Sequence, residues 1–189
     1  MNDMSTRAAA DLSGRPARFT ADEFMQVLDA AATLDIKLEL GDGGLERMSS
    51  PSDDHGRHQS LVMTHLVRAL GAAADRLLRI EVAVCLSGDT VRVPDLLLLR
   101  DAGEVRGARD PASLLLAVEI SERTLAKDLG VKRDEYARAG IPFYWVVEGA
   151  SAVTHVHAHP VDGEYRNIAV VRFNEPLPIP GTDATITLA

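Results

Sequence analysis

The chain has 189 residues, of which 46% are hydrophobic and 25% are charged, as is ordinary for one globular domain. Its formal net charge of −8 excludes a protein that coats nucleic acid through a broad basic face, but not an enzyme that meets a phosphodiester through a metal and a few local cations. No apolar run approaches a membrane span, and the lone Cys85 excludes an internal disulfide. Residues 1–18 lack the apolar centre of a signal peptide. We therefore expect a cytoplasmic protein with a disordered leader over 1–18, a single domain over 19–189, and Cys85 in the core.

A helix and a hairpin are the first elements that the sequence predicts. A capping box at 20–23 precedes apolar residues at helical spacing, so we predict a helix over about 21–32. Residues 34–40 alternate apolar with polar, which predicts a half-buried strand with Glu39 on its polar face. A glycine-rich turn then returns the chain into a short partner strand at 45–48.

A long helix follows over about 54–78, with apolar residues along one face. His55 and His58 lie in its first turn, where the helix dipole disfavours a cation. At least one of them should therefore have a specific neighbour, although a solvated surface histidine stays open. His65 falls on the apolar side, and we expect it in the core.

An acid marks the start of the next buried segment. We predict a strand over 80–86 and an antiparallel return over 90–99, with Pro94 inside it. Proline in a strand indicates an edge or an irregularity, which would aim the side chain of Asp95. An unbroken apolar run follows Asp95, so its carboxylate costs desolvation free energy unless it is paired.

A second acid follows in a strand–helix–strand unit. The run 114–120 is apolar apart from Glu119, a helix follows over about 125–139, and an aromatic strand covers 143–147. The two strands of such a unit should be parallel. Two acids on buried strands, with Lys132 in the helix, have the composition of a divalent-metal site.

Other interpretations of the same residues remain open. Asp95 could turn or cap a strand, and Glu119 could pair with Lys132 or Arg133 as a buried ion pair without metal. Asp128 and Lys132 could form a surface pair one helical turn apart. Thr124 is the expected cap of that helix.

A histidine-rich hairpin closes the chain. Two strands are predicted around the turn at 162–163, and a last short strand includes Ile186 and Leu188. Three histidines alternate along the first of these strands: His155, His157 and His159. They could bind a metal such as zinc, or they could form a solvated strand face.

Several pieces of the sequence occur together in an order that resembles the Uma2 family. The resemblance runs from about residue 19 to 165. Its matching pieces are residues 38–40, 48–51, His55, 91–95, 118–121, Thr124, Asp128, Lys132, Tyr136 and 139–145. The resemblance implies an α/β (α+β) fold of the restriction-endonuclease-like, PD-(D/E)XK superfamily, with a mixed central β-sheet flanked by helices. Two departures are Gly44, where relatives often carry glutamate, and Phe143, where glutamate is usual.

The resemblance implies a Mg²⁺-dependent (or Mn²⁺-dependent) endonuclease acting on DNA or RNA. Asp95 and Glu119 would bind the metal, and the carbonyl of Ile120 is a third candidate ligand. The motif lysine is replaced by Ser121, so Lys132 becomes the substitute and Lys127 its competitor. Glu39 and His55 are further catalytic candidates, and Tyr136 would hold the lysine. A catalytically inactive nuclease-like module that binds protein or nucleic acid is the alternative.

The same resemblance suggests an assembly. Nuclease-like domains often pair, so a homodimer is possible through Tyr144 and Trp145, if these are exposed, or through the hairpin edges.

Overall fold

A computed structural model gives the structure of residues 16–32, 36–103, 105 and 107–189. Residues 1–15 of the expected leader therefore lie outside the described residues, whereas Arg18 forms a 2.6 Å ion pair with Asp42. The helical segments are α1 (Ala21–Ala32), α2 (Asp53–Leu70), a 3₁₀ turn (Gly71–Ala73), α3 (Ala74–Leu77), a second 3₁₀ turn (Pro111–Ser113), α4 (Leu125–Lys127), a π turn (Asp128–Lys132) and α5 (Arg133–Arg138). The strands are β1 (Leu38–Gly41), β2 (Gly44–Arg47), β3 (Leu78–Ile80), β4 (Val84–Ser87), β5 (Thr90–Arg92), β6 (Leu96–Leu99), β7 (Leu114–Ser121), β8 (Phe143–Glu148), β9 (Val153–Val161), β10 (Glu164–Arg172), β11 (Leu177–Pro178) and β12 (Thr185–Ile186).

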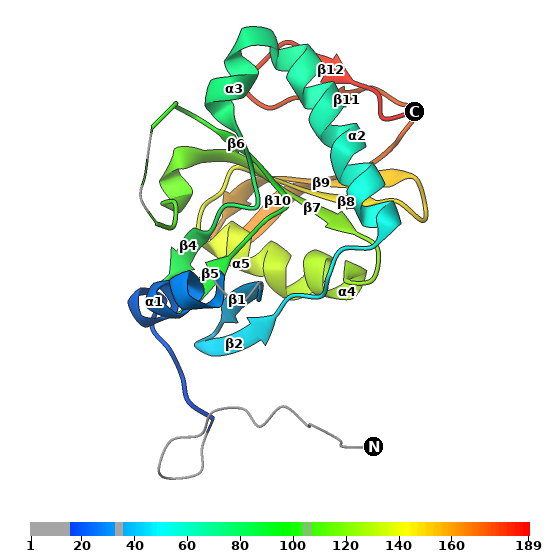
Figure 1. The fold of residues 1–189 in the computed structure, drawn as a ribbon. Coiled ribbons are helices and arrows are strands. Elements are labelled where there is room, and N and C mark those ends of the chain that lie inside the picture. The colour runs from blue at the N-terminus through cyan, green and yellow to red at the C-terminus, as the bar shows by residue number, and fades with distance from the viewer. Residues whose placement is uncertain (1–15, 33–35, 104, 106) are drawn as a thin grey trace, which may run out of the picture.

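A six-stranded mixed sheet forms the centre of the molecule, in the order β10-β9-β8-β7-β6-β3 (Figure 1). Strands β7 and β8 pair in parallel and the other pairs in this sheet are antiparallel. The helical segment between β7 and β8 makes the crossover that parallel pairing requires, so the predicted strand–helix–strand unit is confirmed. The mixed sheet flanked by helices agrees with the expected fold class.

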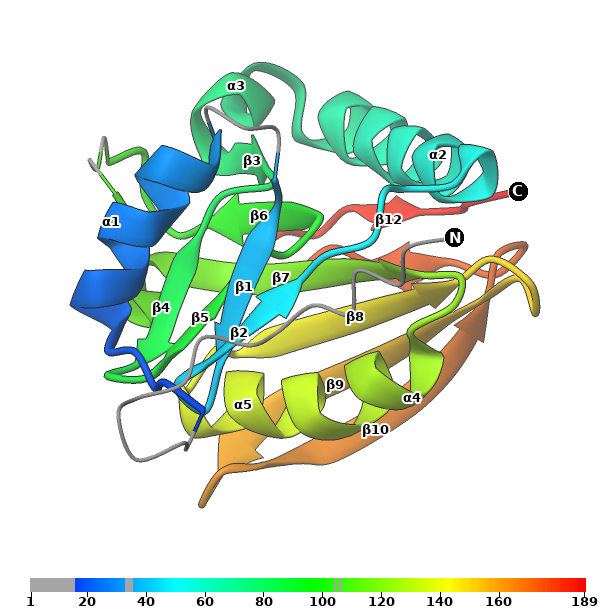
Figure 2. The same cartoon turned by 60° about the horizontal axis from the view of Figure 1, so that its bottom comes forward.

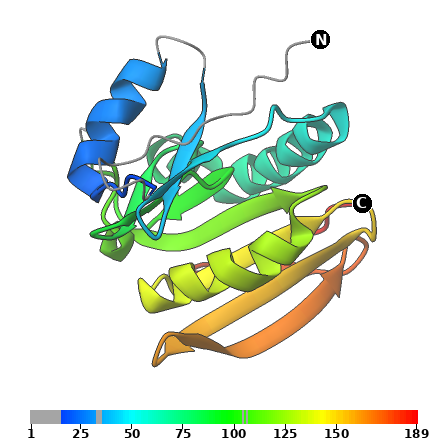
Figure 3. The ribbon, with the colours of Figure 1, turned by 90° about the horizontal axis from the view of Figure 1, so that it is seen from below.

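Each face of this sheet carries its own apolar core. Helix α2 and the β11–β12 pair cover one face, while α4 and α5 cover the other (Figures 1 and 3). A smaller sheet, in the order β2-β1-β5-β4, lies on the same side as α4 and α5. Because side chains alternate along β7, Glu119 points to the face of α5 while Ile120 packs under α2.

Two predicted strands are in fact divided between the two sheets. The strand expected at 80–86 is split into β3 and β4, and the strand expected at 90–99 is split into β5 and β6. Pro94 lies at the second crossing, where it has no amide hydrogen to give to a ladder. The expected irregularity is therefore a change of sheet, and it leaves Asp95 immediately before β6.

The two long helices also differ from their predicted forms. Helix α2 ends at Leu70, because Gly71 adopts a positive φ of 53° and the chain continues through a 3₁₀ turn into the short α3. The helix predicted over 125–139 contains the π turn at Asp128–Lys132. The side chain of Thr124 does not cap this helix, since its hydroxyl donates to Asp128 Oδ2 at 2.5 Å.

Burial corrects several expectations. Tyr144 and Trp145 are 0% and 1% exposed, so they cannot supply the surface of a homodimer. His65 is half-buried, and the buried histidine of α2 is His58. Cys85 is also half-buried rather than fully in the core. Among the described residues, no helix is long and apolar enough to span a membrane.

Candidate active site

A cavity of about 280 Å³ lies where the smaller sheet meets the end of β7 and the starts of α2 and α4. Figure 2 shows α2 and α4 on opposite faces of the central sheet, with their starts, and the segment that joins β2 to α2, near the same end of β7. All five predicted catalytic residues line this cavity, as does Ile120. The five are Glu39, His55, Asp95, Glu119 and Lys132.

Asp95 is held between β7 and α2. Its Oδ2 accepts the backbone N–H of Ile120 at 2.6 Å, and its Oδ1 lies 3.1 Å from Nε2 of His55. The hydrogen bond to Asp95 raises the pKa of His55, against the lowering effect of partial burial. Ser52 caps α2 by accepting the amide hydrogen of His55, which fixes the backbone that carries this imidazole.

Glu119 is buried near the end of β7. Its Oε1 accepts hydrogen bonds from Lys132 Nζ and from the Tyr136 hydroxyl, both at 2.9 Å. Burial outweighs the opposing effect of Lys132 and, together with the negative charge of Asp95, raises the pKa of Glu119 to about 8. Tyr136 thus holds the acid, not the lysine as the sequence suggested.

The π turn places Lys132 inside the cluster of acids. Its amine lies 2.9 Å from Glu39 Oε1 and 2.9 Å from Glu119 Oε1, with Glu39 contributed by the smaller sheet. Burial lowers the pKa of this amine, but the adjacent Glu119 and Glu39 raise it overall, so Lys132 carries a charge. Asp128 and Lys132 are both buried, so the alternative of a surface pair between them is wrong. Turns of π-helix occur frequently at functional sites.

Lys127 takes the outer position. Its amine lies 2.6 Å from Glu46 Oε2 and 3.3 Å from Glu39 Oε2, and about a third of its side chain is exposed. Lys132, not Lys127, contacts Glu119. The geometry therefore favours Lys132 as the substitute for the missing motif lysine.

Arg92 is a buried residue of this region to which the sequence analysis assigned no role. Its guanidinium binds both carboxylate oxygens of Glu135, at 2.7 and 2.8 Å, and also contacts Glu46 at 2.6 Å and Glu39 at 3.3 Å. Burial would raise the pKa of Glu39, but Lys132 and Arg92 lower it overall. Glu39 is therefore a buried carboxylate among cations, not a group on a solvated strand face. The only sequence signal was an arginine between two apolar residues of a buried strand.

His58 and Glu122 form a second acid–imidazole pair beside the cavity, which the sequence analysis also did not identify. Nδ1 of the buried His58 lies 2.7 Å from Oε1 of Glu122, and Glu122 lines the cavity. Gly149 leaves room for the pair, since a Cβ there would stand 2.2 Å from the His58 ring. The absence of a side chain at Gly149 is thus a condition of this contact.

The donor atoms around the cavity suit a hard cation. Two carboxylates, Asp95 and Glu119, line it together with Ile120, and oxygen donors are those that Mg²⁺ and Mn²⁺ take. The raised pKa of Glu119 has the charge of Asp95 among its causes, and a bound cation would relieve that repulsion. The described residues nevertheless contain no group of three or more His, Cys, Asp or Glu side chains already arranged around a metal position.

The three histidines of β9 do not share one environment. His155 contacts Glu148 at 2.9 Å, and His157 is buried between Tyr144 and Tyr165. His159 has a positive φ of 61°, which breaks the alternation that would have placed all three on one face. Burial lowers the pKa of His157 to about 4. The zinc interpretation and the solvated-face interpretation are both wrong for this strand.

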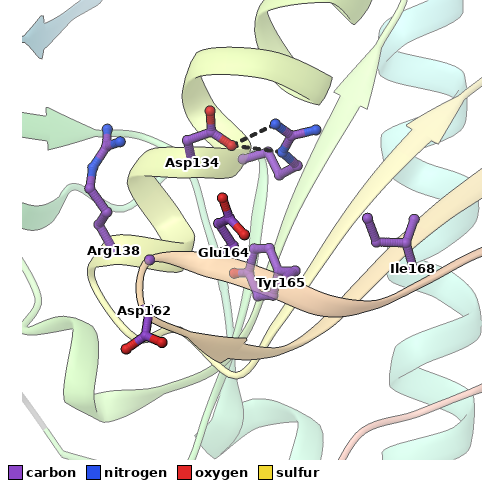
Figure 4. A pocket seen from close by; sticks show the side chains of 8 residues that line it. Asp134, Arg138, Asp162, Glu164, Tyr165 and Ile168 are labelled. Atoms are coloured by element: carbon purple, nitrogen blue, oxygen red, sulfur yellow. Dashed lines mark hydrogen bonds and ion pairs between the residues drawn. The ribbon is translucent and has the colours of Figure 1, made fainter.

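A larger cavity of about 440 Å³ lies between α5 and the turn that joins β9 to β10 (Figure 4). Its lining includes Asp134, Arg138, Glu164 and Tyr165, and none of the predicted site residues. The clustered acids and the buried lysine are all at the smaller cavity, which is therefore the candidate active site.

Comparisons with known proteins show the family and the fold of the chain. The model of the Uma2 family, described as "Putative restriction endonuclease", matches residues 21–189. Among solved structures, a protein from Anabaena variabilis described as a "putative nuclease" superposes with a TM-score of 0.64 at 16% sequence identity. The alignment covers 90% of this chain and 95% of that one, and at this identity it shows the fold alone. None of the curated proteins matches the chain.

Proposed function

We propose a function from the premise that the chain belongs to the Uma2 family. The chain is a nuclease that hydrolyses phosphodiester bonds of DNA or RNA with Mg²⁺ or Mn²⁺. The observation that carries the proposal is the meeting of Asp95, Glu119 and Lys132 at one cavity, although they come from three separate elements. Asp95 and Glu119, with the Ile120 carbonyl, would hold the cation. When bound, the cation would lower the pKa of a water molecule and offset charge on the phosphate.

The side chains of the cavity divide the remaining tasks. The charged Lys132 amine is fixed by Glu39 and Glu119, so it would stabilise negative charge that develops on the phosphate without having to reorient. His55, held by Asp95, would donate a hydrogen bond to a phosphate oxygen. Tyr136 keeps Glu119 in one position.

Cleavage of labelled oligonucleotides tests this function. The chain should hydrolyse single-stranded DNA, duplex DNA or RNA with Mn²⁺, and Asp95→Asn or Glu119→Gln should lower the rate by at least ~100-fold. Glu175→Gln, at an exposed acid outside the cavity, is the matched control and should keep the wild-type rate. If both site variants cleave as fast as the control, the proposed site is wrong.

A non-catalytic module is the second candidate, favoured by Ser121 at the position of the motif lysine and by the absence of a ready metal-ligand group among the described residues. The two candidates differ in metal binding. A nuclease should gain thermal stability from Mn²⁺, because a ligand that binds only the folded state stabilises it, and Glu119→Gln should abolish the gain. A melting temperature that does not respond to Mn²⁺ would favour the module.

A further inference from the structure

The cavity is lined by five lysine and arginine side chains, and three of them already have carboxylate partners. Lys37 pairs with Glu81 at 2.7 Å, Lys127 pairs with Glu46, and Lys132 is held by two acids. The other two are Arg47 and Arg123. The three lysines of this cavity are thus each held by a carboxylate, whereas within the residues that the structure describes the two arginines are not.

Arg47 and Arg123 are exposed, and neither has an ion pair or a side-chain hydrogen bond among the described residues. Arg47 ends β2, and Arg123 lies between β7 and α4, so they come from different walls of the cavity. Both stand on anchored backbone. The residue after Arg47 donates its amide hydrogen to Lys37 O, and the residue after Arg123 accepts two amide hydrogens from the first turn of the next helix.

The cavity continues outward on the side of Arg47. A second hollow of about 490 Å³ is lined by Lys37, Arg47 and residues 48–51, all of which also line the active-site cavity. Ser49 and Ser50, which line both hollows, are exposed and offer hydroxyl groups. The two hollows thus share a polar lining that includes the unpaired guanidinium of Arg47.

Guanidinium groups bind phosphate through two parallel hydrogen bonds, and they keep their charge at every physiological pH. On a chain with a formal charge of −8, most of the surface repels a polyanion. Two unpaired arginines beside one cavity therefore supply local positive charge on an acidic chain. We expect a polyanion to approach the chain at this cavity.

We propose that Arg47 and Arg123 form a phosphate-binding site that holds the backbone of a nucleic acid on either side of the cavity. This inference rests on the proposed function for the identity of the polyanion, and it deepens that function by assigning two substrate-binding residues. Because phosphate contacts carry no base information, the site should serve every sequence equally. DNA and RNA share this chemistry, so both are included in the test.

Fluorescence anisotropy of labelled oligonucleotides in a chelator measures binding without cleavage. The double variant Arg47→Ala/Arg123→Ala should bind on the order of 10–100-fold more weakly. The dependence of log K on log salt should become shallower by about 1.8 for duplex DNA and by about 1.4 for a single strand, since two phosphate contacts are lost. DNA and RNA oligonucleotides of several sequences should show the same loss, and a loss for one sequence alone would contradict phosphate binding.

Arg68→Ala/Arg76→Ala is the matched control. These arginines are also exposed and without a side-chain partner in the described part of the chain, but they line neither hollow. The control removes the same charge, so equal weakening of oligonucleotide binding by both double variants would overturn the site. A wild type that shows no measurable binding would also overturn it. If the wild type cleaves in Mn²⁺ but Arg47→Ala/Arg123→Ala binds as tightly as the wild type, only this inference is wrong. Arginine-dependent binding without cleavage in Mn²⁺ would refute the proposed function alone.

Discussion

At the scale of single residues, the candidate site is a network of buried charges whose partners are all identified. Glu39 is 2% exposed, Glu119 is 5% exposed, and both accept hydrogen bonds from the Lys132 amine. Removing one member of a buried ion pair is costly because it leaves an uncompensated charge, whereas exposed pairs contribute little. The two lysines of this region therefore have different energetic roles.

Lys132→Met should lower the free energy of unfolding by about 3–5 kcal/mol, because two buried carboxylates lose their shared cation. Lys127→Met should lower it by about 1 kcal/mol or less, because that amine and its partner Glu46 are each about a third exposed. Urea denaturation of both variants measures the difference. Equal losses would mean that Lys132 is not the central cation of this network.

At the scale of elements, the local patterns of the sequence determined most of what could be predicted. The capping box at Thr20 and Glu23 is formed as expected, with the Thr20 amide 2.9 Å from the Glu23 carboxylate, and the parallel pairing of β7 with β8 follows from the crossover between them. What the sequence did not show were contacts between distant positions. Arg92 meets Glu39, Glu46 and Glu135, which lie 53, 46 and 43 residues away.

The same limit explains the divided strands. Periodicity describes which side of a segment is apolar, but it does not say which sheet the segment joins, so the change of sheet at Pro94 could not be predicted from alternation. The acids at Asp95 and Glu119 were identifiable because a carboxylate beside a buried apolar run is costly and therefore conspicuous. Their roles in catalysis remain proposals.

Helix α2 is fixed to the end of β7 through the pair of His58 and Glu122, and Gly149 makes that contact possible. A Cβ at 149 would stand 2.2 Å from His58 Cε1 and 2.4 Å from Glu122 Oε1, so Gly149→Ala must displace the pair. We expect a loss of about 1–3 kcal/mol in unfolding free energy, which is typical of overpacking.

Gly56→Ala, in the first part of α2, is the matched control for this substitution. No atom lies within 4 Å of a Cβ at 56, so alanine should stabilise the helix by about 0.5–1 kcal/mol. Thermal denaturation of both variants should thus give shifts of opposite sign. A Gly149→Ala chain as stable as the wild type would show that the contact of α2 with β7 does not depend on the His58–Glu122 geometry.

At the scale of the whole molecule, the central sheet has one long unpaired edge. Strand β10 is nine residues long and ends the sheet, and within the described residues no strand pairs with its outer side (Figure 3). Ile168 and Val170 on this strand are 61% and 57% exposed, more than any other large hydrophobic side chain in the described chain. Exposed edge strands with apolar side chains tend to pair with another chain. With Tyr144 and Trp145 buried, this edge is where the expected homodimer could form.

The wild type should therefore self-associate through β10, and Ile168→Lys should keep it monomeric, because a charge on an edge strand opposes edge-to-edge pairing. Sedimentation velocity over a range of concentrations up to about 1 mM would detect even weak association. Val67→Lys replaces an apolar side chain of α2 that is 40% exposed and not on a sheet edge, so it adds the same charge without touching β10. A wild type that stays monomeric throughout would show that the β10 edge is not an interface. A dimer that both variants retain would show that the chain associates through another surface.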